Sequence, residues 1–165
     1  MSNAPLARLW PGLLLVACGT HALAATTTTT FVVQATIIQD CSVSATNMNF
    51  GTLGLLTINY DANSVITPVC TAGTVYNLGL DGGTVAGSAP GARLLGNAGG
   101  STILFDLYRD AARSTMWGNT AGTNTVSGTG TGQAQPYTVY GRIAPQATTP
   151  AAGTYNTTIT VTVTY

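Results

Sequence analysis

Hydrophobic and polar side chains alternate along several short stretches of this chain, and the clearest of them lies at residues 30–38. Its apolar residues fall on every second position and polar residues stand between them: Phe31, Val33, Ala35 and Ile37, with Thr30, Gln34 and Thr36. Side chains two apart share one face of a strand, so the pattern predicts a β-strand with one apolar face. A run of threonines precedes it, with no turn and no earlier strand as partner. Such a strand has to pair in its own sheet or in another molecule's, and we favour the second interpretation.

The same alternation predicts about six principal strands in the remainder of the chain, at residues 48–51, 65–71, 75–80, 103–108, 137–143 and 155–165. We expect residues 65–71 and 75–80 to form a hairpin, with Pro68 placing the first of them at an edge or a bulge. Residues 111–135 predict a long loop or a poorly ordered hairpin. In the last strand one face carries Ile159, Val161, Val163 and Tyr165, and threonines occupy the other.

Short strands separated by Gly-rich turns, without helical periodicity over three turns, indicate an all-β fold. The expected architecture is an immunoglobulin-like antiparallel β-sandwich. Six strands are one fewer than the seven of a complete immunoglobulin-type sandwich. We therefore expect an incomplete sandwich, accompanied by the N-terminal strand that we interpret as a donor to a neighbouring copy.

The first 24 residues predict an export signal. Arg8 supplies positive charge, residues 9–17 are apolar, and Ala22-Leu23-Ala24 offers a small-x-small cleavage pattern. The expected organisation is a signal peptide at residues 1–24, a donor-strand segment at 25–40 and one domain at 41–165. An alternative remains, because Leu15-Val16-Ala17-Cys18 also resembles a lipobox, which would make Cys18 a lipid-anchored first residue.

Charged residues are scarce, with no lysine and no glutamate, and the expected mature part has four arginines and five aspartates. Without a basic patch to neutralise phosphates, nucleic acid is not expected as a partner. A near-neutral surface rich in Thr and Gly suits a protein that packs against its own copies, and it suits an inert exported domain equally well.

Cys41 and Cys70 are the cysteines that remain after the expected cleavage. An even pair in an exported protein predicts a disulfide. Metal binding is the competing interpretation, but His21 lies in the expected signal and no further thiol is available. We expect neither a metal nor another cofactor.

The usual catalytic groups are missing from the expected mature chain, which has no histidine, lysine, glutamate or free thiol. Asp106 and Asp110 are close enough in sequence to suggest a glycosidase pair. We interpret them, with Arg109 and Arg113, as solvated charge at a strand end. No enzymatic activity and no small-molecule substrate are expected.

Several motifs, taken in order, resemble the spore coat protein U domain, a family that includes the pilins of archaic chaperone-usher pili such as Csu pili. The resemblance rests on Cys41-Ser42-Val43-Ser44-Ala45, Phe50-Gly51, Val69-Cys70-Thr71, Leu80-Asp81-Gly82-Gly83, residues 107–113, Val139-Tyr140-Gly141-Arg142-Ile143 and residues 153–165. It covers nearly the whole expected mature chain. One departure is Asn156-Thr157, where the family pattern leads us to expect an acidic residue.

The resemblance implies an immunoglobulin-like domain that lacks its last strand, is held by a periplasmic chaperone and is passed to an outer-membrane usher. The expected function is a structural pilus subunit at the cell surface, joined to related subunits by donor-strand complementation, for attachment and biofilm formation. If the roles known for the family apply here, the neighbour's groove would be filled by Phe31, Val33, Ala35 and Ile37. Cys41 and Cys70 would form the disulfide, and the last strand would form the groove edge.

Three alternatives stay open at this stage. The N-terminal strand can fold into its own sheet as an ordinary first strand. The chain can be a minor or tip adhesive subunit that grips surfaces through Trp117, although this residue is equally interpreted as a partly buried loop anchor. It can also be a structural protein of a spore coat, as the family name suggests.

Overall fold

The computed structural model describes residues 24–165, and over these residues the chain forms eight β-strands and no helix. They are β1 (Cys41–Ala45), β2 (Tyr60–Cys70), β3 (Val75–Leu80), β4 (Arg93–Gly96), β5 (Thr102–Tyr108), β6 (Val126–Thr129), β7 (Tyr137–Ile143) and β8 (Val161–Thr164). The described residues therefore include no helix capable of crossing a membrane. The chain divides into two units, Met1–Ala35 and Thr36–Tyr165, and all eight strands lie in the second. The predicted export signal, including Cys18, falls almost entirely outside the described residues.

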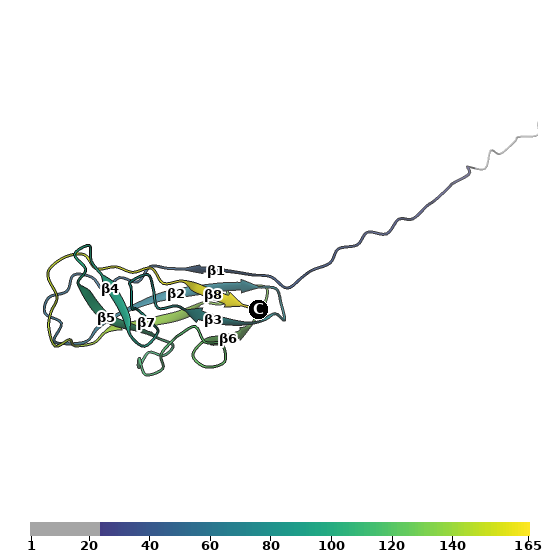
Figure 1. Cartoon of the computed structure of the whole chain (residues 1–165). Coiled ribbons are helices and arrows are strands. Elements are labelled where there is room, and N and C mark those ends of the chain that lie inside the picture. The colour runs from purple at the N-terminus through teal and green to yellow at the C-terminus, as the bar shows by residue number, and fades with distance from the viewer. Residues whose placement is uncertain (1–23) are drawn as a thin grey trace, which may run out of the picture. The chain divides into compact units, whose positions relative to one another are not determined.

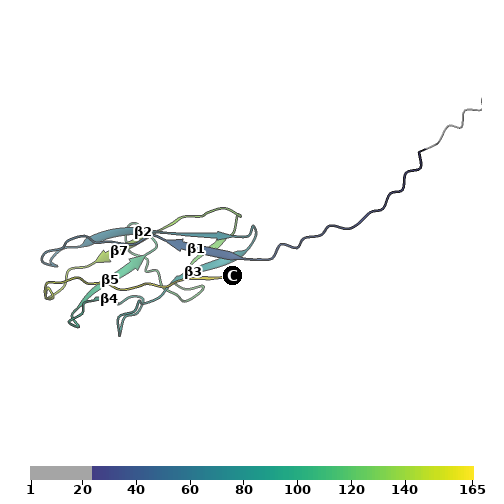
Figure 2. The same ribbon diagram turned by 90° about the horizontal axis from the view of Figure 1, so that it is seen from above.

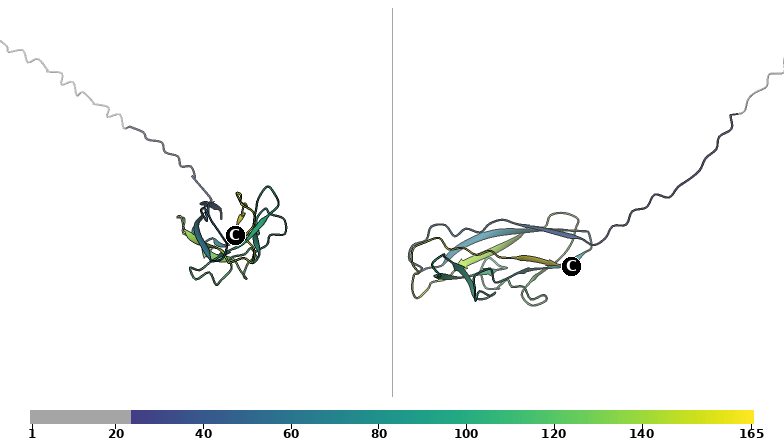
Figure 3. Two further views of the ribbon diagram at one scale, coloured as in Figure 1. Left: turned by 90° about the vertical axis from the view of Figure 1, so that its left-hand side faces the viewer. Right: turned by 45° about the horizontal axis from the view of Figure 1, so that its top comes forward.

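Two antiparallel sheets form the domain (Figures 1 and 2). One has five strands in the order β1-β2-β7-β5-β4, and the other has three in the order β6-β3-β8. Seen along the strands, in the left panel of Figure 3, the sheets face each other as two layers. The predicted all-β antiparallel sandwich is confirmed.

The core lies between the two layers because alternate side chains of each strand point inward. On β5 the buried apolar face is the predicted one, with Ile103, Phe105 and Leu107 at most 8% exposed. It faces β3, whose inward side chains are fully buried: Tyr76, Leu78 and Leu80. The predicted bounds of β3 and of β7 agree with the structure.

The segment that follows β1 contributes to the core without being a strand, so the strand predicted at residues 48–51 is wrong. A Cβ at Gly141 would lie 2.2 Å from the Met48 sulfur, which shows how closely this segment approaches β7. Phe50 meets Phe105 edge-to-face, with ring centroids 6.2 Å apart. The apolar residues of this segment are therefore anchors of a covering loop, and their alternation does not reflect pairing.

The hairpin predicted from residues 65–71 and 75–80 is also wrong, because β2 and β3 belong to different sheets. Their inward side chains, such as Ile66 and Leu78, pack face to face across the core. Pro68 lies neither on an edge strand nor at a bulge, since β2 is covered by β1 on one side and β7 on the other. Its carbonyl accepts a hydrogen bond from the backbone N–H of Gln135, two residues before β7 begins. The Pro68 nitrogen carries no hydrogen and needs no acceptor.

Two further strands differ from their predicted extent. The long loop predicted at residues 111–135 contains β6, which pairs with β3. The strand predicted at 155–165 shortens to β8, Val161–Thr164, preceded by an extended segment that makes a single bridge from Asn156 to Gly96. Burial still alternates through this segment as the sequence predicts.

The predicted disulfide between Cys41 and Cys70 is confirmed, and it joins the first residue of β1 to the last residue of β2. These residues are direct partners in the β1–β2 ladder, with Cα atoms 4.1 Å apart. The bond ties the edge strand β1 to the sheet at the point where the N-terminal segment enters the domain.

Replacing both cysteines by alanine is expected to lower the free energy of unfolding by about 3 to 4 kcal/mol, because the loop they close spans 29 residues and the unfolded chain regains its entropy. Urea unfolding of the two proteins measures the difference. A loss below about 1 kcal/mol would mean that β1 needs no covalent anchor.

Candidate functional site

Two sheet edges next to each other have no pairing strand within residues 24–165. β1 pairs only with β2, and β8 pairs only with β3. The two strands are spatial neighbours without forming a ladder. Each therefore presents a row of unpaired backbone groups, which is a template for a further strand.

The backbone of the segment before β8 shows which groups are free. The N–H groups of Thr158 and Thr160 donate to the Thr84 hydroxyl at 3.3 Å and the Asp81 carboxylate at 2.9 Å. Successive residues of an extended chain direct their backbone groups to opposite sides. The N–H and C=O groups of Ile159 consequently face the open edge, and those of Val161 and Val163 continue the same row.

A cleft of 1110 Å³ with an apolar floor opens along this edge. One wall is the covering loop after β1, and the other is the extended segment that leads into β8. Side chains of both sheets form its floor, among them Ile66, Leu80, Ile103, Phe105 and Ile143. This volume exceeds the range of typical small-molecule pockets, so the cleft is large enough for an extended peptide segment.

The predicted groove-edge residues line or adjoin this cleft. Ile159 and Val161 are among its lining residues, and together with Val163 they pack on the core while remaining partly exposed. Tyr165 is 55% exposed. Inward side chains that stay half-covered indicate a sandwich whose core is incompletely closed.

The predicted donor residues lie in the segment before β1 and belong to no strand of either sheet. Phe31, Val33 and Ile37 are 87%, 83% and 81% exposed, and Ala35 is exposed as well. The alternative in which this segment is an ordinary first strand of its own sheet receives no support from the described residues. Three large apolar side chains in water carry an unfavourable hydration cost that a partner surface would remove.

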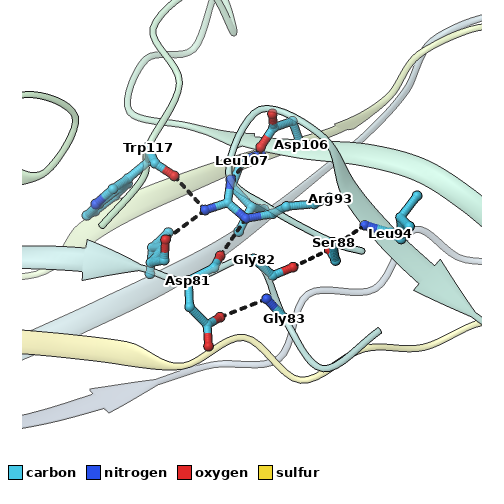
Figure 4. Close-up of polar contacts among 10 residues, drawn as sticks. Asp81, Gly82, Gly83, Ser88, Arg93, Leu94, Asp106, Leu107 and Trp117 are labelled. Carbon is cyan, nitrogen blue, oxygen red and sulfur yellow. Dashed lines mark hydrogen bonds and ion pairs between the residues drawn. The ribbon is translucent and has the colours of Figure 1, made fainter. Parts of the chain in front are cut away.

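A buried arginine, which the sequence did not single out, joins β4 to β5 and to the end of β3 (Figure 4). Arg93 on β4 is 0% exposed and forms an ion pair with Asp106 on β5. Its guanidinium also donates to the carbonyls of Asp81, Leu80 and Trp117, at 2.8, 2.9 and 2.7 Å. Burial lowers the pKa of Arg93, and the carboxylate of Asp106 opposes that shift.

Arg93 thereby connects the five-stranded sheet to the wall of the cleft. Two of the carbonyls that it binds, those of Leu80 and Asp81, lie at the end of β3, where Asp81 begins a turn by accepting a hydrogen bond from Gly83 N–H at 2.9 Å. The same Asp81 oxygen accepts from Thr160 N–H, immediately before β8. The one sequence signal for this arrangement was Asp81-Gly82-Gly83, which predicts a turn but not its ionic partner.

Asp106 and Asp110 do not form a common site, and the prediction of solvated charge is wrong for Asp106, which is buried against Arg93. Asp110 lies in the turn after β5 and accepts hydrogen bonds from the backbone N–H groups of Ser114 and Thr115. These bonds lower the pKa of Asp110 to about 2. Over residues 24–165 no three His, Cys, Asp or Glu side chains gather as metal ligands would.

Trp117 does not offer an adhesive surface, because it is 1% exposed. Its indole N–H donates to the Leu78 carbonyl at 2.9 Å. It is a core residue from a loop, more deeply buried than the partly buried anchor that we expected.

The fold and the cleft together define a class of protein: an antiparallel β-sandwich with an open edge, bordered by two strands that lack partners. Comparison with known families places the chain within this class. The model of the Spore Coat Protein U domain matches residues 27–162, and the chain belongs to that family, as the sequence motifs predicted.

Two known proteins illustrate the relationship. Protein U of Myxococcus xanthus is 31% identical over 157 residues, which cover 86% of this chain and 87% of the relative. A chain in the crystal structure of the CsuC–CsuE chaperone–tip adhesion subunit pre-assembly complex, from the archaic chaperone-usher Csu pili of Acinetobacter baumannii, matches with a TM-score of 0.60. At 22% identity this match supports the fold, and it covers 79% of our chain but 41% of that one.

Proposed function

We propose that this chain is a structural subunit of a chaperone-usher pilus and that it polymerises by donor-strand complementation. In each joint, residues 31–37 of the donor-strand segment 25–40 of one copy fill the cleft of the next. Phe31, Val33, Ala35 and Ile37 enter the core of the partner, and the segment's backbone pairs with the free edges of β1 and β8.

One observation carries the proposal: the same chain has a cleft with an apolar floor beside the unpaired edges of β1 and β8, and an exposed segment with the alternation of a strand. Burying a large apolar side chain contributes about 1.5 to 3 kcal/mol. Three such side chains and a new backbone ladder make a stable joint. The period of two restricts the register, because a slip of one residue turns the apolar side chains outward.

The proposal includes a route to the surface. The signal at residues 1–24 directs the chain out of the cytoplasm, and the mature protein begins at residue 25. An open cleft of this size is an aggregation hazard before assembly, so a periplasmic chaperone covers it and an outer-membrane usher exchanges chaperone for subunit. Pili of this kind attach cells to surfaces and support biofilms. No catalytic role is proposed.

Assembly into ladders tests this function. The mature chain, produced in a bacterial periplasm with a chaperone of this pilus class, is expected to yield linear multimers that survive SDS at room temperature and dissociate on boiling. Native gels and electron microscopy measure them. A chain that stays monomeric after release from the chaperone would refute donor-strand assembly.

A second candidate is a structural protein of a spore coat, which the description of the matching family model, Spore Coat Protein U domain, favours. Both functions are structural, and they differ in where the protein is found. Antibody labelling of intact cells distinguishes them: surface fibres support the pilus subunit, whereas label confined to spore coats supports the alternative.

A further inference from the structure

The last residues before β1 are hydrogen-bonded to the domain, although the segment that precedes them is exposed. The Thr71 hydroxyl, just after β2, lies 3.1 Å from the Ile38 carbonyl, to which it donates, and it accepts from Asp40 N–H at 3.2 Å. The backbone N–H of Thr71 donates to the Asp40 carbonyl at 2.9 Å. A single residue thus binds the chain at two points within three residues.

The Asp40 side chain extends these contacts to both strands that border the cleft. Its carboxylate accepts from Cys41 N–H at 3.0 Å, at the start of β1, and from the Tyr165 hydroxyl at 3.2 Å, beyond the end of β8. We call Ile38, Asp40, Thr71 and Tyr165 the clasp. The disulfide of Cys41 anchors the clasp to β2.

We propose that Thr71 is a positioning residue that fixes the direction in which the N-terminal segment leaves its own domain. This inference rests on the proposed function, in which residues 31–37 are held inside the neighbouring subunit. Only three residues then separate that neighbour from β1, and they span at most about 11 Å. Free rotation in this linker would let the two subunits swivel, whereas a clasped linker gives successive subunits a preferred orientation.

The bonds of the clasp are exposed to water, so each is weak by itself. Their number within so short a stretch is what restricts the linker. Loss of the Thr71 hydroxyl removes the bond that it accepts from Asp40 N–H and the one that it donates to the Ile38 or the Asp40 carbonyl, and it leaves the backbone bond from Thr71 N–H in place. The expected consequence is a looser linker in an otherwise unchanged domain.

The variant Thr71→Val tests this in the full mature chain, because it removes the hydroxyl and keeps the β-branched shape. We expect the amide order parameters of Ile38, Gln39 and Asp40 to fall from about 0.85 to below about 0.6. The measurement is ¹⁵N relaxation in a Val33→Asp background, which keeps the protein monomeric. Thr67→Val is the matched control: Thr67 lies on β2 opposite Ser44 of β1, four residues before Thr71, and its side chain makes no hydrogen bond in the described structure.

Fibres provide the second measurement. In a chain that keeps the native Val33, Thr71→Val is expected to form SDS-resistant ladders as the wild type does. Its fibres are expected to have at least a two-fold shorter persistence length in electron micrographs. Thr67→Val fibres should match the wild type. Unchanged order parameters, or changed order parameters with unchanged persistence length, would overturn the role of Thr71.

The two measurements separate this inference from the proposed function. A wild-type chain that forms no fibres refutes the proposed function and the orientation role together. Fibres without any effect of Thr71→Val refute only the inference. Relaxation data on the monomer report on the clasp in either case.

Discussion

Replacing Val33 by Asp is expected to abolish SDS-resistant ladders while leaving the domain folded and able to accept a wild-type donor. Val33 is 83% exposed in the single chain, so the change does not disturb the core of its own domain. In the cleft of a neighbour it would place an unpaired carboxylate among apolar side chains. That burial costs several kcal/mol, in addition to about 1.5 kcal/mol of lost Val burial. Native gels of the released subunit measure the effect.

The neighbouring valine supplies the matched control. Val32 is 88% exposed and lies on the opposite face of the predicted strand, so Val32→Asp should leave the ladders intact. The two variants share the residue type, the charge change and a high exposure, and they differ in which face of the strand carries the new aspartate. Ladders lost in Val32→Asp and kept in Val33→Asp would show that the other face enters the cleft. Ladders kept in both would exclude this segment as the donor.

Replacing Arg93 by Ala is expected to lower the free energy of unfolding by about 3 to 5 kcal/mol, because it leaves Asp106 charged and buried without its partner. The carbonyls of Leu80 and Asp81 at the end of β3, and that of Trp117, lose their donor at the same time. Keeping the guanidinium charged at this buried position is costly, since burial lowers the pKa of Arg93 despite the neighbouring carboxylate. Urea unfolding in the monomeric Val33→Asp background measures the loss.

Arg142 is the matched control for this prediction. It forms a two-point ion pair with Asp61, at 2.8 and 2.9 Å, but both side chains are partly exposed. Solvent screening limits such a pair to about 1 kcal/mol or less, so Arg142→Ala should cost far less than Arg93→Ala. Equal losses would contradict the structural role of the buried pair. The double variant Arg93→Met/Asp106→Leu should recover part of the stability, since it buries no lone charge.

The strands of the core were the most predictable elements because their alternation arises from the two-sided environment of a sandwich. On β5, Ile103, Phe105 and Leu107 face the core as the sequence indicated. The wrong predictions, the strand at 48–51 and the hairpin of 65–71 with 75–80, share a cause. Alternation of apolar and polar residues indicates which side chains are buried, but it does not indicate which segments pair. Met48 and Phe50 alternate as loop anchors, and Ile66 and Leu78 belong to strands adjacent in sequence that lie in different sheets.

Polar residues were harder to place for a related reason. Asp106 falls on the face of β5 that was predicted to point outward, and no local pattern indicates that its partner is Arg93, 13 positions away. Only the fold brings β4 beside β5 and leaves Arg93 completely enclosed. Trp117 was misjudged similarly, since a loop rich in Gly and Thr carries no sign that its one indole enters the core.

The sequence by itself determined the all-β class, the disulfide pair and the alternation of residues 30–38, because these depend on local period, cysteine count and composition. The tertiary structure decided which strand edges stay unpaired, that a cleft opens between the loop after β1 and the segment before β8, and that Arg93 binds Asp81, which in turn binds that segment. These features join residues far apart in the chain. Their energies come from contacts that exist only once both sheets have packed, and no local pattern encodes them.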